Sequence, residues 1–146
     1  MLSLYTVLLT LHIVFVVAWV GAGITQTVLA RQLVGAGGAN QAYAQQLEWF
    51  GAKWFPTASG LAGLAGIGLW IDGPWGLGEP WIIIAVAGWI ASSVIGATQL
   101  GPGVAKWRAN GAAADDPAWA RVLLFARIDQ AILILVIADM VMKPGL

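Results

Sequence analysis

A single histidine in the first apolar stretch of the chain is the side chain best suited to chemistry. His12 shares one helical face with Tyr5, Trp19 and Gln26, because steps of seven residues return to nearly the same angle on a helix. A neutral imidazole at that depth could bind haem iron or relay a proton. It could also be a core histidine that is hydrogen-bonded to a neighbouring helix. The polar and aromatic stripe is expected to point into the protein, and both interpretations of His12 stay open.

A second group of polar residues lies in the last apolar stretch. Arg127 and Asp129 are two residues apart, so on a helix they point in different directions and cannot pair along one face. Arg127 can extend towards lipid headgroups, whereas Asp129 is too short and needs a partner such as Gln26 or Gln99 on another helix. Together with Gln130, these side chains would form either a polar pocket that opens to the cytoplasm or a buried network that fixes helix packing.

The composition excludes several kinds of site and protein. The 146 residues include no cysteine and one histidine, which excludes disulfides, thiolate metal sites and zinc cages of several histidines. The formal net charge is zero, so no overall field would attract nucleic acid. Hydrophobic residues make up 60% of the chain and charged residues only 10%, against about 25% charged residues in soluble domains. A chain of this composition needs lipid as its solvent.

Four apolar stretches are long enough to cross a bilayer. A hydrocarbon core of about 30 Å needs about 20 apolar residues in a helix, and helices satisfy their backbone amides without water. The predicted fold is therefore all-α, a polytopic membrane protein whose single domain, residues 1–146, is a four-helix transmembrane bundle. Residues 41–53 are expected to be helical at the membrane interface, and residues 101–117 to form a polar loop. The predicted spans cover about residues 4–30, 54–71, 81–100 and 122–142.

The basic residues predict how these spans are oriented. Five of them flank the first and third loops, and Lys143 alone lies at the opposite side. By the positive-inside bias, the first and third loops face the cytoplasm and both termini face outside. Asp139 lies within a turn of the outer interface and is expected to be solvated. The expected location is the bacterial inner membrane. The five residues are Arg31, Lys53, Lys106, Arg108 and Arg121.

Small residues recur at helical spacing in the second and third spans. Membrane helices associate through close packing of small residues and through interhelical hydrogen bonds, since lipid is as apolar as leucine. These positions therefore predict close helix contacts. They are Ser59, Gly63 and Gly66 in the second span, and Gly88, Ser92 and Gly96 in the third.

Several of these segments resemble known families. The segment LHIVFVVAW, from Leu11 to Trp19, resembles the first span of the HemJ-type membrane protoporphyrinogen oxidases. Pro56 followed by GIGLW at residues 66–70 resembles their second span, and residues 127–144 resemble their last. Residues 47–56 and 72–75 are similar to a bacterial family of unknown function, which is related to the membrane domain of copper-resistance protein D.

The resemblance implies a helical bundle in which His12 binds haem. The oxidase pattern has further histidines, after the first span and in the third, and this chain has neither, so two histidines of one chain cannot hold the iron. A homodimer, or a methionine, lysine or water as the second axial ligand, would complete such a site. The expected haem contacts are Trp19 on the same helical face and Arg127 or Lys143 near a propionate.

Three functions are compatible with these features. The sequence favours a non-catalytic component or accessory subunit of a membrane assembly, because its loops are short and small residues abound. Its partners would be the lipid bilayer and either further copies of the chain or a larger complex, with no nucleic acid. One alternative is a haem-binding redox protein that uses His12. The other is a small oligomeric transporter that uses a pocket of Gln26, Gln99 and Asp129.

Overall fold

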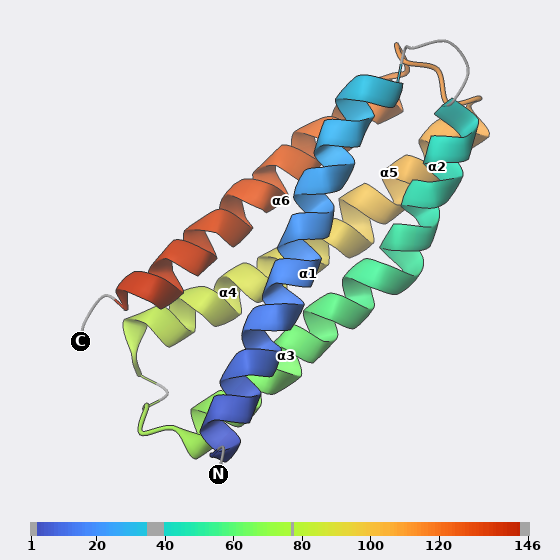
Figure 1. The fold of residues 1–146 in the computed structure, drawn as a ribbon. Coiled ribbons are helices and arrows are strands. Elements are labelled where there is room, and N and C mark those ends of the chain that lie inside the picture. Colours follow the sequence, from blue (N-terminus) through green and yellow to red (C-terminus); the bar gives the residue numbers. More distant parts are fainter. Residues whose placement is uncertain (1–2, 35–39, 77, 144–146) are drawn as a thin grey trace.

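The computed structural model describes residues 3–34, 40–76 and 78–143, and most of them are helical (Figure 1). No β-strand occurs in these three ranges, so the all-α prediction is confirmed for this part of the chain. The segments labelled η are π-helical. In chain order the elements are α1 (Leu4–Leu33), α2 (Asn40–Trp49), η1 (Phe50–Trp54), α3 (Phe55–Asp72), α4 (Pro80–Ile95), η2 (Gly96–Leu100), α5 (Gly101–Ala109) and α6 (Pro117–Met142).

Several of these elements join end to end into longer helices. The segments α2, η1 and α3 form one helix of 33 residues, Asn40–Asp72, and α4, η2 and α5 form one of 30 residues, Pro80–Ala109. With α1, which also has 30 residues, the chain has three helices that are long and apolar enough to cross a membrane. A helix of 30 residues is about 45 Å long, which exceeds the about 30 Å of a bilayer core. The chain therefore has the helices of a membrane protein.

The last helix, α6, is almost as long but more polar. It has 26 residues and carries Arg127, Asp129 and Asp139 within its length. It begins with proline at its first position, and the side chain of Asp116 caps it by accepting a hydrogen bond of 2.7 Å from the N–H of Ala118. The charged residues set α6 apart from the other three long helices.

Helical structure extends beyond the predicted spans on one side. The third span was expected to end near residue 100 and a polar loop to follow, but α5 continues the helix to Ala109. Residues 41–53, which were expected to be helical, lie in α2 and η1. The difference arises at Pro102, which would interrupt a regular α-helix but follows a π-helical turn here.

Both π-helical segments end two residues before a proline. The N–H of Phe55 bonds to the carbonyl of Phe50, and the N–H of Gly101 bonds to the carbonyl of Gly96, so each bond spans five residues instead of four. Proline lacks an N–H, and its ring clashes with the preceding turn of an α-helix. The wider π turn accommodates the ring, so the two long helices continue past Pro56 and Pro102.

The long helices pack in pairs. Helix α1 packs along α3, and α4 packs along α6, while α2 meets α5 at one end of the molecule (Figure 1). We call this end, where Leu33, Asn40, Ala109 and Pro117 lie, the basic end. The start of α1 and the end of α6 lie at the opposite end, which we call the terminal end. The paired helices leave space between the α1–α3 pair and the α4–α6 pair.

In the third predicted span, close contact is observed at one small residue, Gly88, and is absent at another, Gly96. At Gly88 of α4, a Cβ atom would lie 2.2 Å from Cγ2 of Val136 in α6, so only glycine allows the two helices to approach this closely. At Gly96 in η2, a Cβ atom would meet nothing within 4 Å. The small residues therefore allow close contact with α6 at Gly88. They make no such contact at Gly96.

An aromatic cluster joins the helices at the basic end. The rings of Trp107 and Trp119 stack with their centroids 4.1 Å apart, and Tyr43 meets both rings edge-on. Trp107 is fully buried, and its indole N–H donates a 2.8 Å hydrogen bond to the carbonyl of Ala113. The hydroxyl of Tyr43 donates to the carbonyl of Gln26 in α1 at 2.7 Å. The cluster ties α1, α2, α5 and α6 together.

Candidate functional site: a cavity between the helices

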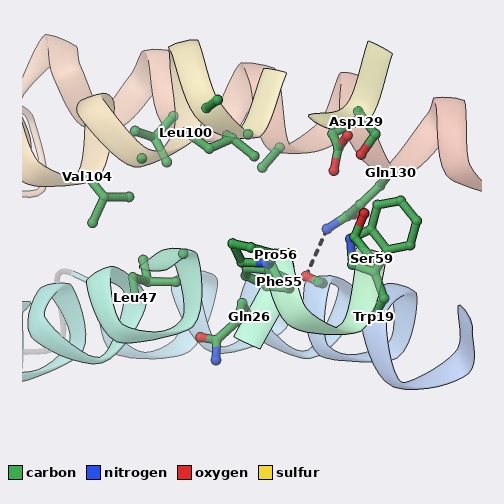
Figure 2. Close-up of a pocket in the computed structure, with 18 of the residues that line it drawn as sticks. Trp19, Gln26, Leu47, Phe55, Pro56, Ser59, Leu100, Val104, Asp129 and Gln130 are labelled. Carbon is green, nitrogen blue, oxygen red and sulfur yellow. Dashed lines mark hydrogen bonds between the residues drawn. The ribbon is translucent and has the colours of Figure 1, made fainter. Parts of the chain in front are cut away.

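A cavity of about 800 Å³ lies between the two helix pairs (Figure 2). Every α-helix and both π segments contribute to its lining. It extends from the aromatic cluster at the basic end, where Tyr43 and Trp119 line it, to Trp19 and Leu133 near mid-length of the long helices. Its volume is within the range of about 300–1,000 Å³ that is usual for small-molecule sites.

The walls of the cavity are mainly apolar and aromatic. Trp19 and Leu133 are buried, with 8% and 5% of their surface exposed, and they belong to one packed cluster with Phe55 and Trp89 at its edge. The indole N–H of Trp89 donates a hydrogen bond of 2.9 Å to Oγ of Ser59 across α3 and α4. Two indole rings therefore stand at the wall of the cavity with their positions fixed by packing and hydrogen bonding.

Asp129 is the acidic residue of α6 that lines this cavity. Its side chain points from α6 into the space between the helices (Figure 2). The hydroxyl of Ser92 on α4, which is buried, lies within hydrogen-bonding reach of the carboxylate. The other carboxylate oxygen, Oδ1, is buried and accepts no hydrogen bond from any described residue. A buried acidic oxygen without a donor is costly, so a partner for it would stabilise the protein.

Gln130 crosses the space beside Asp129. Its Nε2 atom donates a hydrogen bond to Oγ1 of Thr27 and another, of 2.9 Å, to the carbonyl of Gly23, so it links α6 to α1 (Figure 2). Both donors of this amide are used by α1. Gln130 therefore fixes the distance between α6 and α1 at the depth of Asp129.

The other two glutamines of the predicted polar pocket lie in different surroundings. Gln26 lines the cavity and is buried, and its Oε1 atom has no hydrogen-bond partner within the described ranges. Gln99 does not line the cavity; it accepts a 2.9 Å hydrogen bond from Arg121 near the surface. Arg127 is exposed and also lies outside the lining. The structure therefore brings Gln26, Asp129 and Gln130 to one cavity and places Gln99 and Arg127 elsewhere.

His12 lies between α1 and α3, away from the cavity. Its Nδ1 atom is 2.8 Å from the carbonyl oxygen of Ala62, and because a carbonyl only accepts, Nδ1 must carry the proton. The remaining nitrogen, Nε2, is buried and unpartnered among the described residues. At the same edge of the ring, a Cβ atom at Gly66 would lie 3.2 Å from Cε1 and 3.3 Å from Nδ1. The Nδ1–Cε1 edge of the imidazole thus packs against α3.

Of the stripe that shares a helical face with His12, the residues Trp19 and Gln26 line the cavity and His12 does not. No group of three or more histidine, cysteine or acidic side chains that could hold a metal ion occurs in the described part of the chain. Haem binding by His12 stays a prediction.

Lys143 lies at the terminal end, far along the chain from the cavity lining. Its ammonium group stands 4.4 Å from the ring centroid of Trp75 and 5.2 Å from that of Trp81, which is cation–π geometry. Asp139, expected to be solvated, is buried instead, with 6% of its surface exposed and Oδ2 without a donor in the described structure.

Two cavity residues, Phe55 and Trp89, were not identified from the sequence as site residues. A signal for Trp89 existed, because most tryptophans of this chain flank the apolar stretches, whereas Trp89 lies in the middle of one. Phe55 carries no such signal. It reaches the cavity wall because it directly follows η1, where the helix is locally widened.

Comparisons of the chain with protein-family models, with curated proteins and with solved structures find no match. The resemblance to the HemJ-type oxidases and to the membrane domain of copper-resistance protein D therefore stays a prediction. The function has to be argued from the cavity itself.

Proposed function

We propose that this protein is a non-catalytic four-span membrane protein that binds a hydrophobic cation within the bilayer. Its basic loops would face the cytoplasm and its termini the outside, in a bacterial inner membrane. The asymmetry of basic residues supports this orientation, since Arg31, Arg108 and Arg121 lie at the basic end and Lys143 alone at the terminal end. The buried carboxylate oxygens of Asp129 and Asp139 support a fourth span whose acidic face points inward, because such groups avoid lipid.

The observation that carries the proposal is the unpartnered carboxylate oxygen of Asp129 in an aromatic cavity. A charged side chain at the centre of a membrane helix costs about 2.5–3.5 kcal/mol on insertion scales, and such residues mark ligand or ion sites. A cation seated beside Asp129 would offset this cost. Trp19 and Trp89, which line the same cavity, can stabilise a cation further through their ring faces.

The ligand chemistry follows from the rest of the lining. The apolar surface of Leu133, Val122 and Phe55 favours a ligand with a large hydrophobic body. The cavity lining has two acidic residues, but Glu48 is already paired with Arg108, so Asp129 favours a ligand with one positive charge. Because Gln130 is already bonded to α1, it would position the site and leave the charge to Asp129. A lipophilic phosphonium or quaternary ammonium ion has these properties.

Equilibrium dialysis of the purified protein in non-ionic detergent tests the proposal. Tetraphenylphosphonium is the probe, and tetraphenylborate, of the same shape and opposite charge, is the comparison. We expect saturable binding of the cation only, and Asp129→Asn should weaken it at least about tenfold, which corresponds to about 1.4 kcal/mol.

Asp139→Asn is the matched control for this experiment. Asp139 is a second buried acidic residue of α6, but it does not line the cavity, so its replacement should leave binding unchanged. The proposal is wrong if neither tetraphenylphosphonium nor decyltrimethylammonium binds saturably. It is also wrong if Asp129→Asn binds the cation as tightly as the natural chain does.

A further inference from the structure

We propose that the ligand enters the cavity sideways from the bilayer, through an opening between the two π-helical segments. The proposal rests on the function proposed above, because it concerns the route to the same cavity. We call this gap the side opening, and define it by residues 51–60 on one helix and 93–105 on the other. Four observations about these residues carry the inference.

The first observation is where the cavity lining reaches the surface. Every exposed lining residue belongs to one of the two π-interrupted helices, for example Ala52 in η1, and Ala97 in η2 with Ala105 in α5. The lining residues of α1 and α6, such as Trp19 and Val122, are buried or half-buried. The cavity is therefore closed behind by α1 and α6 and reaches the exterior between the other two long helices.

The second observation is how little joins the two helices along this stretch. The π segment η1 packs extensively only with α2 and α3, the segments that flank it in sequence. A Cβ atom at Gly51, Gly60 or Gly96 would meet nothing within 4 Å, so open space adjoins the opening on both sides. The two long helices are therefore separated along the stretch that contains their π-helical segments, η1 and η2.

The third observation is that interactions bound the gap at both its ends. Towards the terminal end, the indole of Trp89 bonds to Ser59 and joins α3 to α4. Towards the basic end, Glu48 and Arg108 form an ion pair, and Gln41 donates to the carbonyl of Arg108 at 3.2 Å, which joins α2 to α5. The side opening is thus a window of limited height in the wall of the protein.

The fourth observation is that the route from the basic end is obstructed. The stacked rings of Trp107 and Trp119, with Tyr43 edge-on, occupy the space between α2, α5 and α6 at that end. A hydrophobic cation concentrates in the bilayer and not in water, so the side route also offers the higher local concentration. The side opening therefore faces the lipid, where the ligand is concentrated.

Filling the window with larger side chains tests the route. We expect the double variant Ala52→Leu with Ala97→Leu to slow both association and dissociation of tetraphenylphosphonium by about tenfold. Both rates should fall together because the new side chains raise a barrier that ligand crosses in either direction. Rapid mixing in proteoliposomes, read by tryptophan fluorescence, measures them, since Trp19 and Trp89 line the cavity.

The matched control is Ala42→Leu with Ala87→Leu. Both alanines are exposed, lie on the same two long helices and do not line the cavity, so the rates should stay unchanged. A second test uses the absence of cysteine from the chain. In the variant Ala52→Cys with Ala97→Cys, a thiol-reactive crosslinker of suitable span should abolish exchange of ligand, and its reductive cleavage should restore it.

The two proposals fail in different ways. If the unmodified protein binds no hydrophobic cation, the proposed function is wrong. If it binds the cation, but the filled and crosslinked variants exchange ligand as fast as the controls, the side opening is wrong and the site stands. A rise in dissociation rate with unchanged association in the filled variant would also overturn the route, because it would place these alanines in the bound site.

Discussion

The indole ring of Trp89 lies directly on the backbone of Gly63, where a Cβ atom would come within 2.7 Å of ring atom Cζ2. The same ring donates its N–H to Ser59, one turn earlier on α3. One side chain of α4 therefore interacts with two positions of α3, packing against Gly63 and donating a hydrogen bond to Ser59. This pair of contacts holds the two helices together beside the cavity.

Replacing Gly63 by alanine should destabilise the protein. The new methyl group would overlap the Trp89 ring, and overpacking of this kind costs about 1–3 kcal/mol. Gly60 is the control on the same helix, because a Cβ atom there meets nothing within 4 Å. Gly60→Ala should be neutral or stabilising by up to about 1 kcal/mol, since alanine favours helix. Reversible unfolding in mixed detergent micelles measures both, and equal effects at the two sites would contradict the contact.

The Gln130 bridge to α1 should show a measurable coupling energy. Gln130→Leu removes the hydrogen bonds to Gly23 and Thr27, and hydrogen bonds between membrane helices contribute about 0.6–2 kcal/mol. Thr27→Val removes only the hydroxyl partner. In a double-mutant cycle, the second substitution should cost little once the first is present. Strict additivity of the two free-energy changes would mean that the side chains do not interact.

Trp107 should be the tryptophan whose loss costs most at the basic end. It is fully buried, stacked on Trp119 and hydrogen-bonded, and truncation of a buried aromatic residue costs about 3–5 kcal/mol. Trp49→Ala is the comparison, because that ring is 54% exposed. Thermal unfolding followed by circular dichroism should show a large fall in Tm for Trp107→Ala and a small one for Trp49→Ala. Similar shifts would disprove the cluster.

Asp129→Asn, which is expected to weaken ligand binding, should also stabilise the ligand-free protein. The carboxylate has an oxygen without a donor, and replacing the charge recovers part of the about 2.5–3.5 kcal/mol that a charged group costs in a membrane helix. Asp72→Asn, at an exposed position, should leave stability unchanged. Unfolding of ligand-free protein in detergent measures both variants, and a loss of stability in Asp129→Asn would show that the carboxylate is already satisfied.

The proposed orientation can be measured by thiol labelling, because the chain has no cysteine of its own. Single cysteines at Ser3 and Gly78, at the terminal end, should react with a membrane-impermeant reagent added to intact cells. A cysteine at Ala114, at the basic end, should react only after the membrane is opened. Labelling of Ala114→Cys in intact cells would reverse the orientation.

The composition alone predicts helices embedded in lipid. A chain with 60% hydrophobic residues, and without the polar–apolar alternation of strands, has few other folds open to it. Polar residues inside apolar stretches also identified part of the polar lining of the cavity, because Gln26, Asp129 and Gln130 all line it. Gln99 was grouped with them and lies elsewhere. Gln99 lies within η2, where residues do not follow the regular 3.6-residue turn, and its side chain bonds to Arg121 instead.

The two π-interrupted helices line the cavity with a repeat of four residues. In a regular α-helix, each step of four residues drifts by about 40° around the axis, so a wall of this length would turn away from the cavity. The wider turn of the π segment offsets this rotation, so the lining residues stay on the side of the helix that faces the cavity. A search of the sequence for 3.6-residue periodicity cannot recover such a wall. Its members are Leu47, Glu48, Gly51, Ala52, Phe55, Pro56, Ser59 and Gly60, and then Ser92, Ser93, Gly96, Ala97, Leu100, Gly101, Val104 and Ala105.

Each π segment is thus equivalent to a single inserted residue placed just ahead of a proline. A homologous chain one residue shorter at that point would keep the same faces on a plain α-helix, but its proline would then clash with the preceding turn. The extra residue and the proline should therefore be gained or lost together in evolution. Homologous chains that lack both the extra residue and the proline would have a narrower cavity wall at the same depth.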